Sequence, residues 1–146
     1  MIKFVKAGAL TLGAITAVAL LPAAAEAASP QSICGAGYTL VKDGSRAIKT
    51  KKGEQLAVTH LLYNGRTGKN CAVTIKTMYI GKPSYTYVGL NVENGTDAGE
   101  GAWFDRYAGP IYVNARHKCV RYSGKASSPD GKKKAFGGRD KFDNCG

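Results

Sequence analysis

The chain has 146 residues, and its 21 Lys and Arg against 10 Asp and Glu give a formal net charge of +11 at pH 7. This length is that of one domain with a modest core. The positive charge favours encounter with anionic partners, such as wall polymers, anionic lipids, acidic polysaccharides or nucleic acid, but it selects none of them.

The N-terminus has the pattern of a secretory signal peptide. Two lysines precede an apolar run that ends before Pro22, and its length of about 15 residues is below the roughly 20 that a membrane-crossing helix needs. Ala25-Glu26-Ala27 matches an A-x-A cleavage site. We therefore expect a signal-peptide helix within residues 1–27 and a single secreted β domain over residues 28–146, with no membrane span after cleavage.

The clearest local pattern in the remaining chain is a β-hairpin. Residues 55–64 and 70–77 are rich in Val, Thr, Ile, Leu and Tyr, which are typical of strands. Asn64-Gly65 and Thr67-Gly68 lie between them and tolerate the positive φ that hairpin turns require. Apolar and polar side chains alternate in the second arm, which predicts one buried face and one mostly solvated face.

Several other short segments have the composition of strands, and no part of the secreted domain has a sustained helical period. The further candidate strands are residues 37–42, 85–92, 102–107, 111–116 and 118–122. Residues 94–101 and 123–138 are predicted to be irregular, because they are rich in Gly and polar residues. The pattern predicts an all-β fold, a small disulfide-stapled antiparallel β-sandwich or barrel-like domain preceded by the signal-peptide helix.

Aromatic residues are the better candidates for ligand binding, because their faces stack on sugars or bases. In the strand that begins at Tyr85, the more apolar face carries Thr86, Val88, Leu90 and Val92. Tyr85 and Tyr87 are therefore expected to point outward, and together with Trp103 and Tyr107 they form the candidate ligand-binding set. In the alternative interpretation, Trp103 and Phe104 fill the core and the tyrosines merely cover it.

Lysines gather in two places and are candidates for anion binding. The two sets are Lys49, Lys51 and Lys52, and Lys132, Lys133 and Lys134. Binding through such charges should weaken as salt rises. The alternative is that both sets lie in solvated loops that keep the protein soluble.

All four cysteines lie in the part expected to be secreted. An even number in an exported chain predicts two disulfides, for which three pairings are possible. We favour Cys34 with Cys71 and Cys119 with Cys145, because each pair then ties one chain end to an interior segment. No C-x-x-C spacing is present, so we expect neither a metal site nor a cofactor.

Residues 63–75, which read Tyr-Asn-Gly-Arg-Thr-Gly-Lys-Asn-Cys-Ala-Val-Thr-Ile, resemble the spore-associated protein A family of secreted actinobacterial proteins. The resemblance extends to residues 107–113 and to the segments that hold the other cysteines, residues 34–38, 118–120 and 144–146. It implies a small exported protein found with the spore surface and supplies no catalytic residue. The chain is more lysine-rich than the family pattern around residues 49–52 and 132–134, so a shared binding partner does not follow.

We therefore expect a secreted protein of the spore or cell surface with a structural or adhesive role and no catalysis. Its partner would be the wall surface, as an anionic polymer or polysaccharide, rather than nucleic acid. One alternative is an extracellular nuclease or hydrolase that uses His60 and His117 as base and acid. A glycosidase would instead need paired carboxylates, for which the candidates are Glu54, Glu93, Glu100 and Asp105. A secreted protease inhibitor is a third possibility, although no sequence feature singles out a reactive loop.

Overall fold

The computed structural model describes residue 19 and residues 27–146, so most of the predicted signal peptide lies outside the described residues. The described chain forms one short helix and eight strands, and the predicted all-β fold is confirmed. The elements are α1 (Pro30–Cys34), β1 (Thr39–Thr50), β2 (Gln55–Asn64), β3 (Lys69–Lys76), β4 (Ser84–Val92), β5 (Asp97–Phe104), β6 (Tyr107–Asn114), β7 (Val120–Ser127) and β8 (Lys134–Asp143). None of the described helices is long and apolar enough to cross a bilayer.

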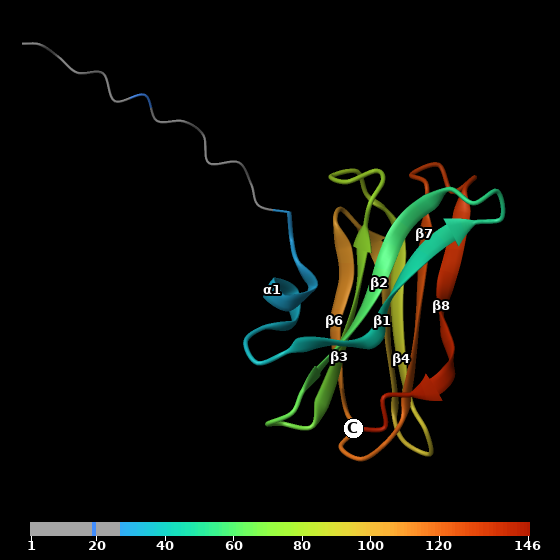
Figure 1. Cartoon of the computed structure of the whole chain (residues 1–146). Coiled ribbons are helices and arrows are strands. Elements are labelled where there is room, and N and C mark those ends of the chain that lie inside the picture. Colours follow the sequence, from blue (N-terminus) through green and yellow to red (C-terminus); the bar gives the residue numbers. More distant parts are fainter. Residues whose placement is uncertain (1–18, 20–26) are drawn as a thin grey trace, which may run out of the picture.

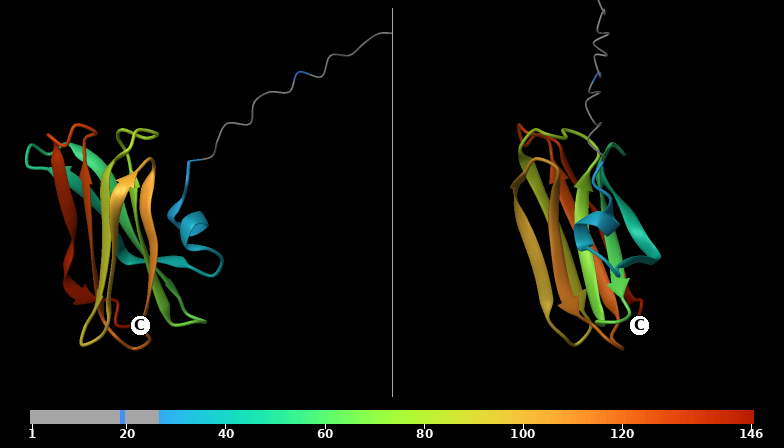
Figure 2. Two further views of the ribbon diagram at one scale, coloured as in Figure 1. Left: turned by 180° about the vertical axis from the view of Figure 1, so that it is seen from behind. Right: turned by 90° about the vertical axis from the view of Figure 1, so that its left-hand side faces the viewer.

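The strands form one antiparallel sheet in the order β5-β4-β7-β8-β1-β2-β3-β6 (Figure 1). The two strands at the ends of this order, β5 and β6, follow one another in the chain and lie in contact. The sheet therefore curls on itself into a nearly closed barrel (Figure 2). The Gly109 N–H donates a hydrogen bond to the Glu100 carboxylate across this seam, at 2.6 Å.

The main core lies inside the barrel and confirms the predicted inward face of β4. Val88, Leu90 and Val92 are buried there beside side chains of β2, β6 and β7. Thr59 and Thr74 add a buried hydroxyl pair, 2.8 Å apart. A Cβ added to Gly124 on β7 would lie 1.9 Å from Thr59 Oγ1, so the interior requires glycine at that position.

The predicted two-faced character of the second hairpin arm is wrong, because β3 is buried almost throughout. Its outer face is covered by the segment around α1, where Cys34, Leu62, Cys71 and Val73 form a separate apolar cluster. The helix α1 was not predicted. It begins with a capping box between Ser29 and Ser32.

Several strand boundaries differ from the prediction. The predicted strand 102–107 spans the turn between β5 and β6, and the predicted irregular segments 94–101 and 123–138 contain part of β5, the end of β7 and the start of β8. Both segments are rich in Gly, and the second is also rich in Lys; both residue types are depleted in strands. Pairing with neighbouring strands holds them extended, as when β5 runs antiparallel to β4 over its whole length.

Both disulfides are present, and they join the pairs that the sequence favoured. Cys34 ties the segment at α1 to β3, with its Sγ 2.01 Å from that of Cys71. Cys119 and Cys145 tie the C-terminus to the residue before β7, with 2.00 Å between the sulfurs. Each bridge anchors one end of the described domain.

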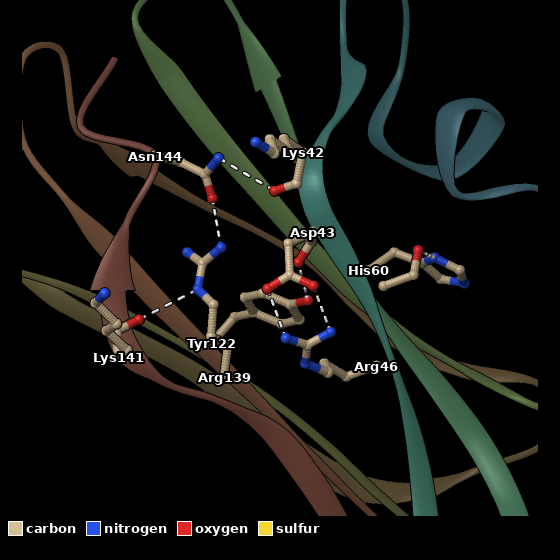
Figure 3. A network of polar contacts seen from close by, with 9 residues as sticks. Lys42, Asp43, Arg46, His60, Tyr122, Arg139, Lys141 and Asn144 are labelled. Carbon is tan, nitrogen blue, oxygen red and sulfur yellow. Dashed lines mark hydrogen bonds and ion pairs between the residues drawn. The ribbon is translucent and has the colours of Figure 1, made fainter.

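A wide bulge in β1 is closed by polar contacts from β7 and the C-terminal segment (Figure 3). Leu40 pairs with Leu62, but the next pair along β1 is Ser45 with His60. Within the bulge, the Lys42 carbonyl accepts a hydrogen bond from the Asn144 amide, 3.2 Å, and the Asp43 carbonyl accepts one from the Tyr122 hydroxyl, 2.8 Å. Arg139 also donates to Asn144, which links β8 to this network.

Candidate ligand-binding face

Exposed aromatic residues meet on the outer face of β5, β4, β7 and β8. Trp103 on β5 lies directly opposite Tyr85 on β4. Two strands further on, Phe136 on β8 lies opposite Lys125 on β7. Trp103 and Phe136 are 59% and 65% exposed, and Tyr85 is 37% exposed. The alternative in which Trp103 and Phe104 fill the core is therefore wrong for Trp103, whereas Phe104 packs against the main core.

These side chains line one shallow groove of about 480 Å³, which we call the aromatic groove. Its lining consists of Tyr85, Trp103, Lys125, Ala126, Ser127, Gly131, Lys134, Ala135 and Phe136. Ala126 and Ala135 border the groove only from below, because both are buried in an apolar cluster with Ile48, Leu56 and Ala57 on the inner face of the sheet. The lining contains two lysines and no acidic residue.

Glycines on β5 let the tyrosine rings lie across that strand. A Cβ added to Gly101 would be 2.7 Å from the Tyr85 hydroxyl oxygen and 2.9 Å from Tyr87 Cδ2. A Cβ at Gly99 would be 3.3 Å from two ring carbons of Tyr87. The Lys125 ammonium lies 5.2 Å from the centre of the Tyr87 ring, within range of a cation–π contact. Packing on this side thus fixes the positions of both rings.

A second groove, of about 570 Å³, adjoins the first, and we call it the basic groove. It is lined by Thr50, Lys51, Lys52, Glu54, Lys132, Lys133, Lys134 and Phe136. The β1–β2 turn, the β7–β8 loop and the adjoining ends of β1 and β8 supply these residues. The turn and the loop lie at the end of the barrel opposite the C-terminus (Figure 1). The two lysine sets that the sequence singled out therefore come together here. Lys49 also borders this region, because it pairs with Phe136.

Most lysines of the basic groove are not paired with a carboxylate in the part of the chain that the structure describes, so the groove is positively charged. Lys133 forms a salt bridge with Glu54, 2.9 Å long, which joins the two lysine sets and raises the pKa of Lys133. Among the described residues, no carboxylate lies within salt-bridge distance of the other lysines of the two sets. Asp130 lies nearby, and hydrogen bonds from Ser128 and the Lys132 N–H lower its pKa.

Not every predicted residue belongs to this face. Tyr107 is partly buried on β6 and packs against the apolar cluster under α1, away from Trp103 and Tyr85. Tyr87 supports the face but does not line the aromatic groove. Phe136 and Lys125 were not among the predicted site residues, because they lie in a segment predicted to be irregular. Only the alternation of Lys125 and Ser127 with Ala126 could have indicated a strand there.

The two histidines have separate local partners. His60 on β2 is half-buried, its Nδ1 is 2.9 Å from the Ser45 hydroxyl, and burial lowers its pKa. The exposed His117 precedes β7 and is hydrogen-bonded through Nδ1 to the Gly146 carbonyl, at 3.0 Å. Neither lines the aromatic groove or the basic groove. The described part of the chain holds no cluster of three or more His, Cys, Asp or Glu side chains arranged to bind a metal ion.

No family model matches the chain, and no solved structure matches it. The chain is 40% identical over 99 residues to spore-associated protein A of Streptomyces coelicolor. The resemblance to the spore-associated protein A family is confirmed. The aligned region covers 66% of this chain but only 58% of the relative's length.

The segments that suggested the resemblance to spore-associated protein A line neither groove. The segments that carried the resemblance surround the disulfides and include parts of β2, β3 and β6. The aromatic groove lies instead on β4, β5, β7 and β8.

Proposed function

We propose that the protein is exported after cleavage of a signal peptide over residues 1–27 and is retained on the outer surface of the spore or cell. Its role there is structural or adhesive and involves no catalysis. The name of the relative from Streptomyces coelicolor, spore-associated protein A, supports this location. Two disulfides support export into an oxidising space.

The convergence of aromatic and basic side chains at Phe136 carries the proposal. The aromatic groove and the basic groove share Phe136 and Lys134, so a single surface ligand can contact both. Lysines attract an anionic surface over a range limited by salt screening. Exposed aromatic faces then contribute contacts that salt does not screen.

The test measures retention of the secreted domain, residues 28–146, on washed spores and cell walls at increasing salt. We expect Gln substitution of Lys51, Lys52, Lys132 and Lys134 to weaken retention at low salt by about tenfold or more, because each lysine near an anionic surface contributes about 1 kcal/mol. The matched control replaces four lysines outside both grooves, Lys42, Lys69, Lys118 and Lys141, and so has the same net charge. Equal loss in the two variants would mean that net charge alone causes retention. Absence of retention at any salt would refute the proposal.

A further inference from the structure

We infer that the surface ligand is an anionic polysaccharide, with sugar rings on the aromatic groove and acidic groups on the lysines of both grooves. This inference rests on the proposed function, because it names the ligand class of the same surface. It depends on three features of the face: its length, its rigid aromatic rings and the kind of cation that lines it.

The length of the face suits a polymer rather than a small molecule. The two grooves run across the strands from Trp103 on β5 to Phe136 on β8 and on to the β1–β2 turn. Three strand spacings separate β5 from β8, which corresponds to about 15 Å. A ligand in contact with Trp103, Phe136 and Lys51 must therefore be elongated and lie across the sheet.

The aromatic rings form a preorganised platform for sugar rings. Trp103 and Tyr85 are cross-strand neighbours, and Gly101 provides the space in which the Tyr85 ring lies over β5. Trp and Tyr have few rotatable bonds, so little conformational entropy is lost when a ligand binds. The apolar C–H face of a sugar can stack on these rings and on Phe136, while Lys125 and Lys134 can bind its polar edge.

The charge of the lining favours an acidic sugar over an uncharged one. Lys125 and Lys134 lie within the aromatic groove itself, beside the rings that would hold the sugar. The basic groove adds Lys51, Lys52 and Lys132, and its carboxylate Glu54 is already paired with Lys133. An uncharged glycan would leave these lysines without anionic partners. A polymer in which sugar rings alternate with acidic groups would instead match both the aromatic groove and the basic groove.

The same lining favours a polysaccharide over single-stranded nucleic acid. All cations that line the two grooves are lysines, and neither groove is lined by an arginine. A guanidinium would bind a phosphate through two hydrogen bonds and stack on a base, whereas a lysine acts as a point charge. The tyrosine rings also lie across β5 and do not stand out from the sheet to insert between bases.

The experiment uses the fluorescence of Trp103, which is the single tryptophan of the chain and lies in the aromatic groove. The secreted domain is titrated with polygalacturonate and hyaluronate, with methyl-esterified polygalacturonate as the uncharged counterpart. Inorganic polyphosphate supplies anions without sugar rings, and oligo-dT supplies single-stranded nucleic acid. We expect at least one carboxylated polysaccharide to change the Trp103 emission and to bind about tenfold or more tightly than the ester, polyphosphate or oligo-dT.

Two variants separate the parts of the face. Phe136→Ala should weaken polysaccharide binding about tenfold and leave its salt dependence unchanged. The double variant Lys125→Gln with Lys134→Gln should reduce the salt dependence itself. Ile80→Ala is the control for Phe136→Ala, because Ile80 is also an exposed apolar residue but lines neither groove. Circular dichroism checks that each variant is folded.

Each other outcome overturns the ligand class. If polyphosphate binds as tightly as the carboxylated polysaccharides, the surface recognises charge alone. If oligo-dT binds more tightly than they do, the surface is a nucleic-acid site. If spores retain the protein in a groove-dependent manner but neither carboxylated polysaccharide binds, the inference fails and the proposed function stands. Failure of both measurements would refute the proposed function as well.

Discussion

Tyr122 shows how a single side chain joins distant parts of the barrel. It is 1% exposed, and its hydroxyl donates to the Asp43 carbonyl at 2.8 Å. The Arg139 guanidinium lies 5.2 Å from the centre of its ring. Burial raises the pKa of Tyr122 to about 12, so the neutral hydroxyl that donates this bond is strongly favoured. The bulge in β1 thus depends on one buried donor from β7.

Tyr122→Phe should destabilise the fold by about 1–3 kcal/mol, because the Asp43 carbonyl loses its buried donor. Urea unfolding measures this loss, with Tyr63→Phe as a control. Above pH 10 the unfolded chain ionises its tyrosine while folded Tyr122 stays neutral up to about 12. Wild-type stability should therefore fall as pH rises from 10 to 12, and the variant should lack that part of the fall. Parallel curves for the two proteins would contradict the assigned donor.

His60 should make stability depend on pH in the opposite range. Burial lowers its pKa below the ordinary 6.5, so the unfolded chain binds a proton that folded His60 does not. Stability should therefore be fully present above about pH 6.5 and decrease as the pH falls below it. Urea unfolding at pH 7.5 and pH 5.5 should show a smaller decrease for His60→Gln than for His117→Gln, the other histidine of the chain. An identical decrease in both would exclude His60 as the cause.

At the scale of elements, β1 depends on a glycine where its bulge crosses β2. A Cβ added to Gly44 would lie 2.7 Å from the carbonyl oxygens of both Leu61 and Val41. Backbone atoms cannot move aside as the end of a flexible side chain can. The bulge that separates the two halves of β1 therefore tolerates no side chain at this position.

Gly44→Ala should destabilise the domain by about 1–3 kcal/mol, as expected for overpacking against fixed atoms. Gly65→Ala is the matched control, because the nearest atom to its added Cβ is 4.0 Å away and its φ is not positive. This control should stay within about 0.5 kcal/mol of wild type. Thermal unfolding of the three proteins provides the measurement, and a control that loses as much as Gly44→Ala would contradict the argument.

At the scale of the whole molecule, the two disulfides and the seam between β5 and β6 complete the barrel. Cys34–Cys71 covers the outer face of β3, and Cys119–Cys145 places Asn144 where it can bind the Lys42 carbonyl. The loops they close span 37 and 26 residues. In the chain-entropy model, each bridge contributes about 3–4 kcal/mol, which is a large part of the stability of a small domain.

Removal of the second bridge should affect more than the C-terminus. Replacing Cys119 and Cys145 with Ala should lower the free energy of unfolding by about 3–4 kcal/mol. Hydrogen exchange should also increase in the β1 bulge, because Asn144 is no longer held beside Lys42. Replacing Cys34 and Cys71 should instead increase exchange at α1 and β3. Unchanged exchange in the bulge of the first variant would contradict the link between these two segments.

The candidate site was only partly predictable. Tyr85, Trp103 and both lysine sets were selected by residue type, and the structure brings them to one face. Phe136 lies where these sets meet, and it was missed because Gly and Lys residues surround it in the sequence. Tyr107 has the same residue type as Tyr85 but lies on β6 against another cluster, which residue type cannot indicate.

The sequence alone determined the all-β class, the hairpin of β2 and β3, and the inward face of β4, because side-chain alternation and turn chemistry are local properties. Only the tertiary structure decided that β4 pairs with β7 and that β1 pairs with β8. Those pairings join segments far apart in the chain, and local propensity carries no information about which strands become partners. They bring the lysines of two loops beside Trp103 and Phe136.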